Sequence, residues 1–144
     1  SIYESNNIHN NRAFDLVEKF QSKKVGIIGL AFKKGTDDLR YSPAVELVEK
    51  LTGKGYSVKI FDKNVVISKL FGSNKSYIEE KLPHISVLLT DSLEDVLNDS
   101  ETVVLVHKLS EVTEMKHRLK DKNIVDLAGY VEFGELPNYE GIAW

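Results

Sequence analysis

Short apolar runs alternate with segments of helical periodicity along most of this 144-residue chain. Compact runs rich in β-branched residues predict strands at 24–30, 56–61, 102–107 and 123–127, and 85–89 is a further short apolar run. Apolar residues at helical spacing predict helices at 11–21, 42–53, 92–97 and 111–119, and a less regular helical stretch in two pieces within 64–82. Residues 1–11 are polar and should be frayed, and the tail 131–144 follows neither pattern.

This alternation of strands and helices predicts an α/β fold, specifically a three-layer Rossmann-like domain with a mostly parallel sheet. Right-handed crossovers between parallel strands then limit the possible topologies. One helix start is well marked, because Ser42 can cap the helix and Pro43 suits its first position. The segment from 24 to 61 is therefore a βαβ unit of ordinary size.

A charged loop follows the first predicted strand. Five charges, on Lys33, Lys34, Asp37, Asp38 and Arg40, fall within eight residues. In open α/β sheets, ligands bind just outside the carboxyl ends of the strands, where this loop would lie. A lysine and an arginine at a strand end suit phosphate. A solvated loop whose basic residues pair with its own aspartates explains the same residues equally well, and both readings stay open.

Two glycines and an aspartate suggest part of a dinucleotide-binding pattern. Gly26 and Gly29 do not complete the G-x-G-x-x-G motif, and Asp62 lies 33 residues after Gly29, whereas a ribose-binding carboxylate usually lies about 20 residues on. The favoured interpretation is that the glycines permit close helix–sheet packing and that Asp62 is a turn residue.

Composition excludes several classes of function. A formal net charge of −3 gives no electrostatic case for binding nucleic acid or an anionic membrane, and no apolar run reaches the length of a membrane span. The chain has no cysteine and its four histidines are scattered, so we expect no metal site. The cytoplasm is the default location. The chain begins with Ser1 and not Met, which favours an excised or trimmed piece.

At the charged loop, the sequence resembles a known family. The residues F-K-x-x-T-x-D-x-R-x-S-P at 32–43 match the pattern of the C-terminal domain of the UDP-glucose/GDP-mannose dehydrogenase family. The run GKGYSVKIFDKNV at 53–65 and the closing E-G-I-x-W are similar to the GDP-mannose 6-dehydrogenase branch, as are shorter matches at 74–79 and 82–85. The resemblance covers 24–144. It implies that 1–22 form the end of a connecting helix and 23–144 a C-terminal sugar-nucleotide-binding domain.

Enzymes of this family oxidise the alcohol at carbon 6 of a nucleotide sugar to a carboxylate, using two NAD+ and a thioester on a catalytic cysteine. Their N-terminal domain holds NAD, and the C-terminal domain contributes to binding the nucleotide sugar. The resemblance implies that Phe32 and Lys33 line the sugar-nucleotide site and that Arg40 reaches the NAD pyrophosphate across the domain cleft. Thr36 and Asp38 would shape the loop.

The sequence departs from the family pattern in three places. Tyr41 stands where the family usually has glutamate, and the turn at 126–129 lacks the arginine of the UDP-glucose branch, which favours GDP-mannose as the ligand. The chain also lacks a cysteine and an NAD-binding fingerprint, so we expect it to be part of an enzyme. Its expected partners are the nucleotide sugar, the N-terminal NAD domain and further copies of itself. A non-catalytic nucleotide-binding or subunit-assembly module is the alternative.

Overall fold

The computed structural model describes residues 2–31, 38–66 and 75–142. Its centre is a five-stranded sheet in which every pair of neighbouring strands is parallel. The strand order is β2-β1-β3-β4-β5. The strands are β1 (Lys24–Ile28), β2 (Ser57–Phe61), β3 (Thr102–Leu105), β4 (Asn123–Asp126) and β5 (Tyr139–Gly141). The predicted α/β class with a parallel sheet is thereby confirmed.

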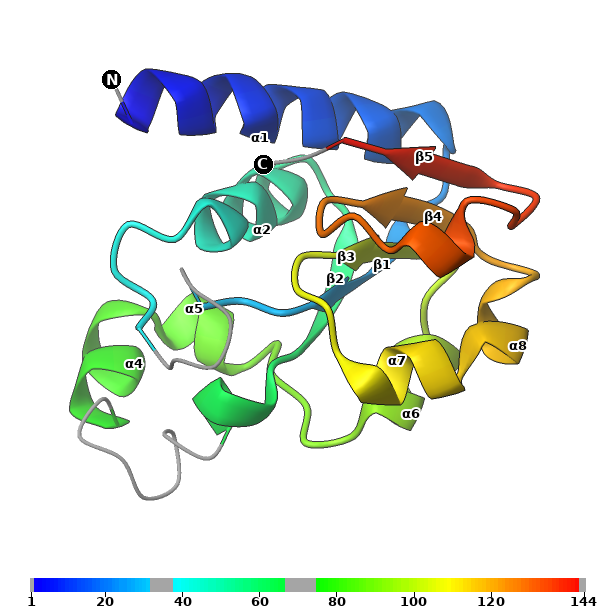
Figure 1. Cartoon of the computed structure of the whole chain (residues 1–144). Coiled ribbons are helices and arrows are strands. Elements are labelled where there is room, and N and C mark those ends of the chain that lie inside the picture. The colour runs from blue at the N-terminus through cyan, green and yellow to red at the C-terminus, as the bar shows by residue number, and fades with distance from the viewer. Residues whose placement is uncertain (1, 32–37, 67–74, 143–144) are drawn as a thin grey trace.

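Helices cover both faces of the sheet, which gives the three predicted layers (Figure 1). One face carries α1 (Ile2–Lys19) and α2 (Pro43–Gly53), and the other carries α6 (Leu93–Asn98), α7 (Ser110–Glu114) and α8 (Lys116–Leu119). The short helices α4 (Lys75–Lys81) and α5 (Pro83–Ser86) pack into the layer of α1 and α2, and a 3₁₀ turn, η1 (Val131–Phe133), lies between β4 and β5.

Successive residues of the strands point into two separate apolar clusters. Ile27 and Val104 belong to the cluster under α1 and α2, whereas their neighbours Ile28 and Leu105 belong to the cluster under α6, α7 and α8. β1, β3 and β4 therefore carry apolar residues on both faces, which explains why they appear in the sequence as continuous apolar runs. No helix in the described parts of the chain is long and apolar enough to cross a membrane.

The strand order places a topological switch point between β1 and β3. The chain leaves β1 for β2 on one side and then returns to β3 on the other side of β1. The loops that follow β1 and β3 consequently diverge and leave a crevice at the carboxyl edge of the sheet. That crevice is where ligands bind in open α/β sheets.

The prediction of a frayed start was wrong, because α1 begins at Ile2. Asparagines have low helix propensity, but packing overrides propensity here. Asn10 is buried and its side-chain amide donates to Glu46 of α2, while Asn11 accepts from Lys50 of α2. The contact with α2 therefore supports the polar part of α1.

The prediction of an irregular tail was also wrong, since 139–141 form the strand β5 beside β4. Tyr130 in this region is buried and stacks on Phe133, and Tyr139 is half-buried. Two smaller differences follow. The apolar run at 85–89 forms the end of α5 and a single β-bridge between Leu89 and Ile60, and the helix predicted at 111–119 is divided into two short helices.

Candidate functional site

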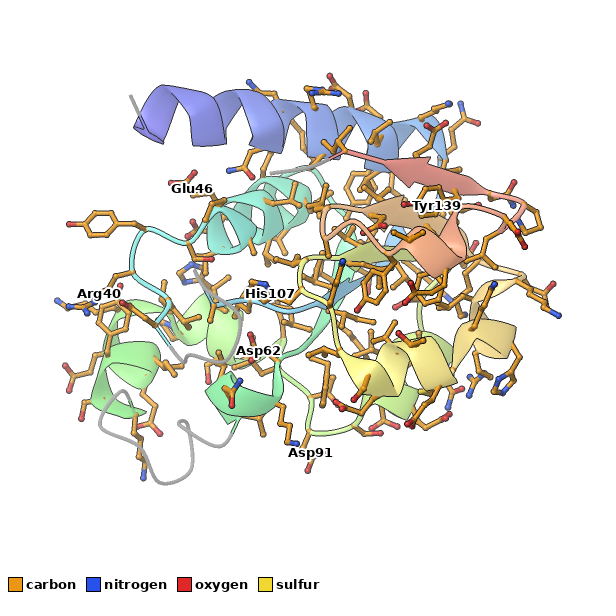
Figure 2. All side chains as sticks on the ribbon, in the orientation of Figure 1. Arg40, Glu46, Asp62, Asp91, His107 and Tyr139 are labelled. Atoms are coloured by element: carbon orange, nitrogen blue, oxygen red, sulfur yellow. The ribbon has the colours of Figure 1, made fainter. Side chains whose placement is uncertain are left out.

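A pocket of about 300 Å³ opens at the carboxyl edge of the sheet, at the switch point. Its walls come from the segments that follow three adjacent strands: Gly29 after β1, residues 62–64 after β2, and residues 107–111 after β3. Figure 2 shows Asp62 and His107, which both line it, near the middle of the molecule. The fold therefore assembles this pocket from segments that lie far apart in the sequence.

His107 lines the pocket and packs against Gly29. The backbone of Gly29 has a φ of +98°, and a Cβ placed there would lie 2.7 Å from Cδ2 of His107. The Nε2 atom of His107 lies 2.8 Å from the carbonyl oxygen of Ala31, which fixes the ring. In a dinucleotide site, a glycine at this place lets a pyrophosphate approach the backbone. Here the imidazole fills that space.

The second glycine serves helix–sheet packing, as predicted. A Cβ on Gly26 would lie 2.6 Å from Cγ1 of Val96 and 2.6 Å from Oγ of Ser100. Val96 belongs to α6, and Ser100 follows that helix. Gly26 therefore lets α6 approach the sheet closely.

Asp62 is a turn residue, as favoured from the sequence. Its side chain is 5% exposed, and both carboxylate oxygens accept backbone N–H groups. Oδ2 accepts from Leu30 at 2.7 Å and Ala31 at 3.0 Å, and Oδ1 accepts from Asn64 at 3.1 Å and Val65 at 3.3 Å. A carboxylate with four internal donors is not available to a ribose. Together with His107, this arrangement does not fit a whole dinucleotide such as NAD in the pocket.

A buried tyrosine holds the loop after β3. The Tyr130 hydroxyl accepts from the backbone N–H of Leu109 at 2.6 Å and donates to the carbonyl of His107 at 2.8 Å. Burial raises the pKa of Tyr130 to about 12. Asp126 in turn accepts the backbone N–H of Tyr130 at 2.7 Å. The pocket wall at 107–109 is thus fixed to the loop after β4, a role that no local pattern in the sequence indicates.

Arg40 lies on a loop that is anchored on both sides. Leu39 is buried before it, and the Ser42 hydroxyl donates to the carbonyl of Leu30 and caps α2. Between these anchors, Arg40 points outward at the edge of the molecule (Figure 2). Tyr41, the departure from the family pattern, has a φ of +59° and is 73% exposed. The loop therefore presents Arg40 and Tyr41 to solvent.

Arg40 forms an ion pair with Asp38, which is the alternative to a ligand contact for this loop. Its Nε lies 3.1 Å from Oδ1 of Asp38, and its Nη2 lies 3.2 Å from Oδ2. The hydrogen bond from Arg40 lowers the pKa of Asp38, and the same contact raises the pKa of Arg40. The side chains are 68% and 45% exposed, so the pair contributes little to stability. Asp38 also accepts the Arg40 backbone N–H at 3.0 Å and so shapes the loop.

The other predicted site residues, Phe32 and Lys33, lie outside the described residues, as does Thr36. The structure thus describes Arg40 alone of the three predicted binding residues. Two lysines that line the pocket, Lys63 and Lys108, were not among the site residues predicted from the sequence. Their only signal was position, since each follows closely on the end of a predicted strand. Among the residues whose side chains the structure describes, 10–31, 38–66 and 75–142, no group of three or more histidine, aspartate or glutamate side chains could hold a metal ion.

Comparison with known proteins gives the family. The sequence profile of the UDP-glucose/GDP-mannose dehydrogenase family, UDP binding domain, matches residues 26–132. The chain belongs to this family. The resemblance in the charged loop and in the flanking runs is thereby confirmed, and the match includes the strands and loops that form the pocket.

Relatives in this family match the whole chain. It is 43% identical to the GDP-mannose 6-dehydrogenase of Pseudomonas aeruginosa over 100% of its own length and 33% of that protein, and 38% identical to that of Azotobacter vinelandii, with the same coverage. A crystal structure of a ternary complex of the Pseudomonas GDP-mannose dehydrogenase superposes with a TM-score of 0.91 at 43% identity, again over 100% of this chain and 33% of the other. The chain thus spans about a third of these dehydrogenases.

Proposed function

We propose that this chain is the C-terminal, sugar-nucleotide-binding part of an NAD-dependent nucleotide-sugar 6-dehydrogenase that converts GDP-mannose to GDP-mannuronate. The observation that carries the proposal is the 43% identity to a GDP-mannose 6-dehydrogenase over the whole chain. Because the chain spans 33% of that relative, the catalytic cysteine and the main NAD site would lie in the remaining part of the enzyme.

Residues 1–22 would be the end of a connecting helix and 23–144 the sugar-nucleotide domain. α1 ends at Lys19, before β1 begins, and its residues Ala13, Phe14 and Val17 pack into the core beside α2, so the connecting helix would end docked on this domain. The assembled enzyme would be a homo-oligomer. In it, Phe32 and Lys33 would bind the nucleotide sugar at the carboxyl end of β1.

NAD would touch this chain at Arg40, and not in the switch-point pocket. Asp38 uses two of the five N–H donors of the guanidinium, and the side chain is 68% exposed. The remaining donors suit two oxygens of a pyrophosphate, a geometry that lysine does not reproduce. Arg40 would thereby link the two domains through the cofactor.

A chimera tests the proposed function. This chain replaces the matching third of the Pseudomonas aeruginosa GDP-mannose 6-dehydrogenase, and NADH formation is followed with GDP-mannose and with UDP-glucose. We expect oxidation of GDP-mannose by the chimera and none by the isolated 144-residue chain. A folded chimera that binds NAD but oxidises neither sugar would count against the proposal.

Substitution of Lys33 tests the substrate contact in the same chimera. Lys33→Ala removes one charged hydrogen bond to phosphate and should weaken GDP-mannose binding by about tenfold or more. The exposed Lys54, at the end of α2, provides a matched control as Lys54→Ala. Unchanged GDP-mannose affinity in Lys33→Ala would contradict the assignment.

A further inference from the structure

Two lysines line the switch-point pocket, and the described part of the chain forms no ion pair with either. Lys63 follows β2 and Lys108 follows β3, and both line the pocket and are exposed. Neither makes a hydrogen bond or an ion pair with another residue among those that the structure describes. Two lysines at one concave site that form no described ion pair can attract an anion.

The other polar groups of the pocket show that a bare inorganic anion is not the best ligand. Glu111 also lines it, and its Oε1 accepts from the Ser110 hydroxyl at 3.0 Å. A carboxylate repels phosphate but accepts hydrogen bonds from hydroxyl groups. Asn64 adds an amide that can both donate and accept. The lining therefore suits a ligand with a phosphate at one end and several hydroxyls at the other.

The size of the pocket favours a ligand smaller than a nucleotide sugar. The pocket holds about 300 Å³, the lower end of the range for small-molecule sites. No phenylalanine, tyrosine or tryptophan is among its described lining residues, so a base finds no such ring on which to stack. The imidazole of His107 is packed against Gly29 and lies close to the carbonyl of Ala31, so it takes up space beside the end of β1.

We propose that this pocket is a second ligand site, for a sugar monophosphate, with Lys63 and Lys108 on the phosphate and Glu111 and Asn64 on the hydroxyls. The site is separate from the nucleotide-sugar contacts proposed for Phe32 and Lys33, and it does not depend on the proposed dehydrogenase function. Its wall at 107–109 is fixed by Tyr130, so the backbone that carries Lys108 is in place before the ligand binds.

Amide chemical shifts of the 15N-labelled 144-residue chain test the proposal, with glucose 6-phosphate, inorganic phosphate and glucose as probes. We expect glucose 6-phosphate to shift the amides of 63–64 and 107–111 and to bind more tightly than either half. Lys63→Gln and Lys108→Gln should each weaken it about tenfold. Glu111→Gln should bring the affinity for glucose 6-phosphate down towards that for phosphate. Lys54→Gln, on an exposed lysine at the end of α2, should change nothing.

Three results would overturn the proposal. The first is the absence of saturable shifts at about 10 mM glucose 6-phosphate. The second is undiminished binding by the Lys63→Gln/Lys108→Gln double variant. The third is displacement of the sugar phosphate by GDP-mannose, which would make the pocket part of the nucleotide-sugar site. Retained GDP-mannose binding by the double variant would separate the two sites.

Discussion

Replacing Asp62 by asparagine should destabilise the fold strongly, although the two side chains have nearly the same size. The Asp62 carboxylate accepts four backbone N–H groups, two on each oxygen, from Leu30, Ala31, Asn64 and Val65. In the variant, one oxygen becomes an NH2 group that faces two donors, so two hydrogen bonds to a charged acceptor are lost. At about 1.5–3 kcal/mol for each such bond, partly offset by relaxation, we expect a loss of about 2–4 kcal/mol.

Urea unfolding of the 144-residue chain, followed by circular dichroism, measures this loss directly. Asp91→Asn is the matched control, because Asp91 is an exposed carboxylate with no described partner (Figure 2). The control should lie within about 0.5 kcal/mol of the parent protein. If Asp62→Asn were equally harmless while nucleotide binding fell, Asp62 would be a ligand residue and the reasoning from its four donors would be refuted.

Three further predictions concern the carboxyl edge. Gly29→Ala should lower the free energy of unfolding by about 1–3 kcal/mol in urea, since a φ of +98° strains any residue with a side chain and the Cβ would meet His107. The double variant with His107→Ala should recover only the part of this loss that comes from the contact with His107. An unchanged free energy of unfolding in Gly29→Ala would contradict this prediction. The pKa of Tyr130 is raised to about 12 in the folded state, so the neutral hydroxyl stabilises the fold fully below pH about 10. This contribution to the free energy of unfolding is lost as the pH rises towards 12. Tyr130→Phe should be less stable at pH 7 and show a shallower alkaline decline, and parallel pH profiles would disprove the link. In the chimera, Arg40→Lys should raise the Michaelis constant for NAD about tenfold, while the melting temperature stays within about 2 °C of the parent. A loss of stability without a selective effect on NAD would mean that Arg40 has a structural role in its pair with Asp38.

Much of the fold follows from local patterns in the sequence. Ser42 and Pro43 specify the start of α2, and the Ser42 hydroxyl does accept from the backbone N–H of Val45. The four longer strands appear as short, mainly apolar runs and can be recognised without tertiary information. By contrast, β5 is three residues long and contains no apolar run, so only its pairing with β4 makes it a strand.

The site was less predictable because it depends on contacts between distant segments. The sequence placed Asp62 at a strand end but left its role to be decided by where the N–H groups of Leu30 and Ala31 lie. Likewise, Lys63 and Lys108 are 45 residues apart, and only the strand order brings them to one pocket. No spacing rule within a single chain segment contains that information.

The two-sided burial of the strands also bears on how the sheet keeps its alignment. When one face is polar, sliding a strand by one residue buries polar groups, but a slide of β1 would exchange Ile27 for Ile28 at little loss of apolar burial. The correct register must therefore be set by the few strand or strand-end positions at which the neighbouring residue cannot be accommodated. Gly26 is one such position, because any side chain in its place would collide with α6. The buried carboxylates Asp62 and Asp126 are two more, because they accept the backbone N–H groups of Leu30 and Tyr130. These residues fix the register of the strands. Substituting one of them would lower the stability of the fold and would also allow strands to pair in the wrong register.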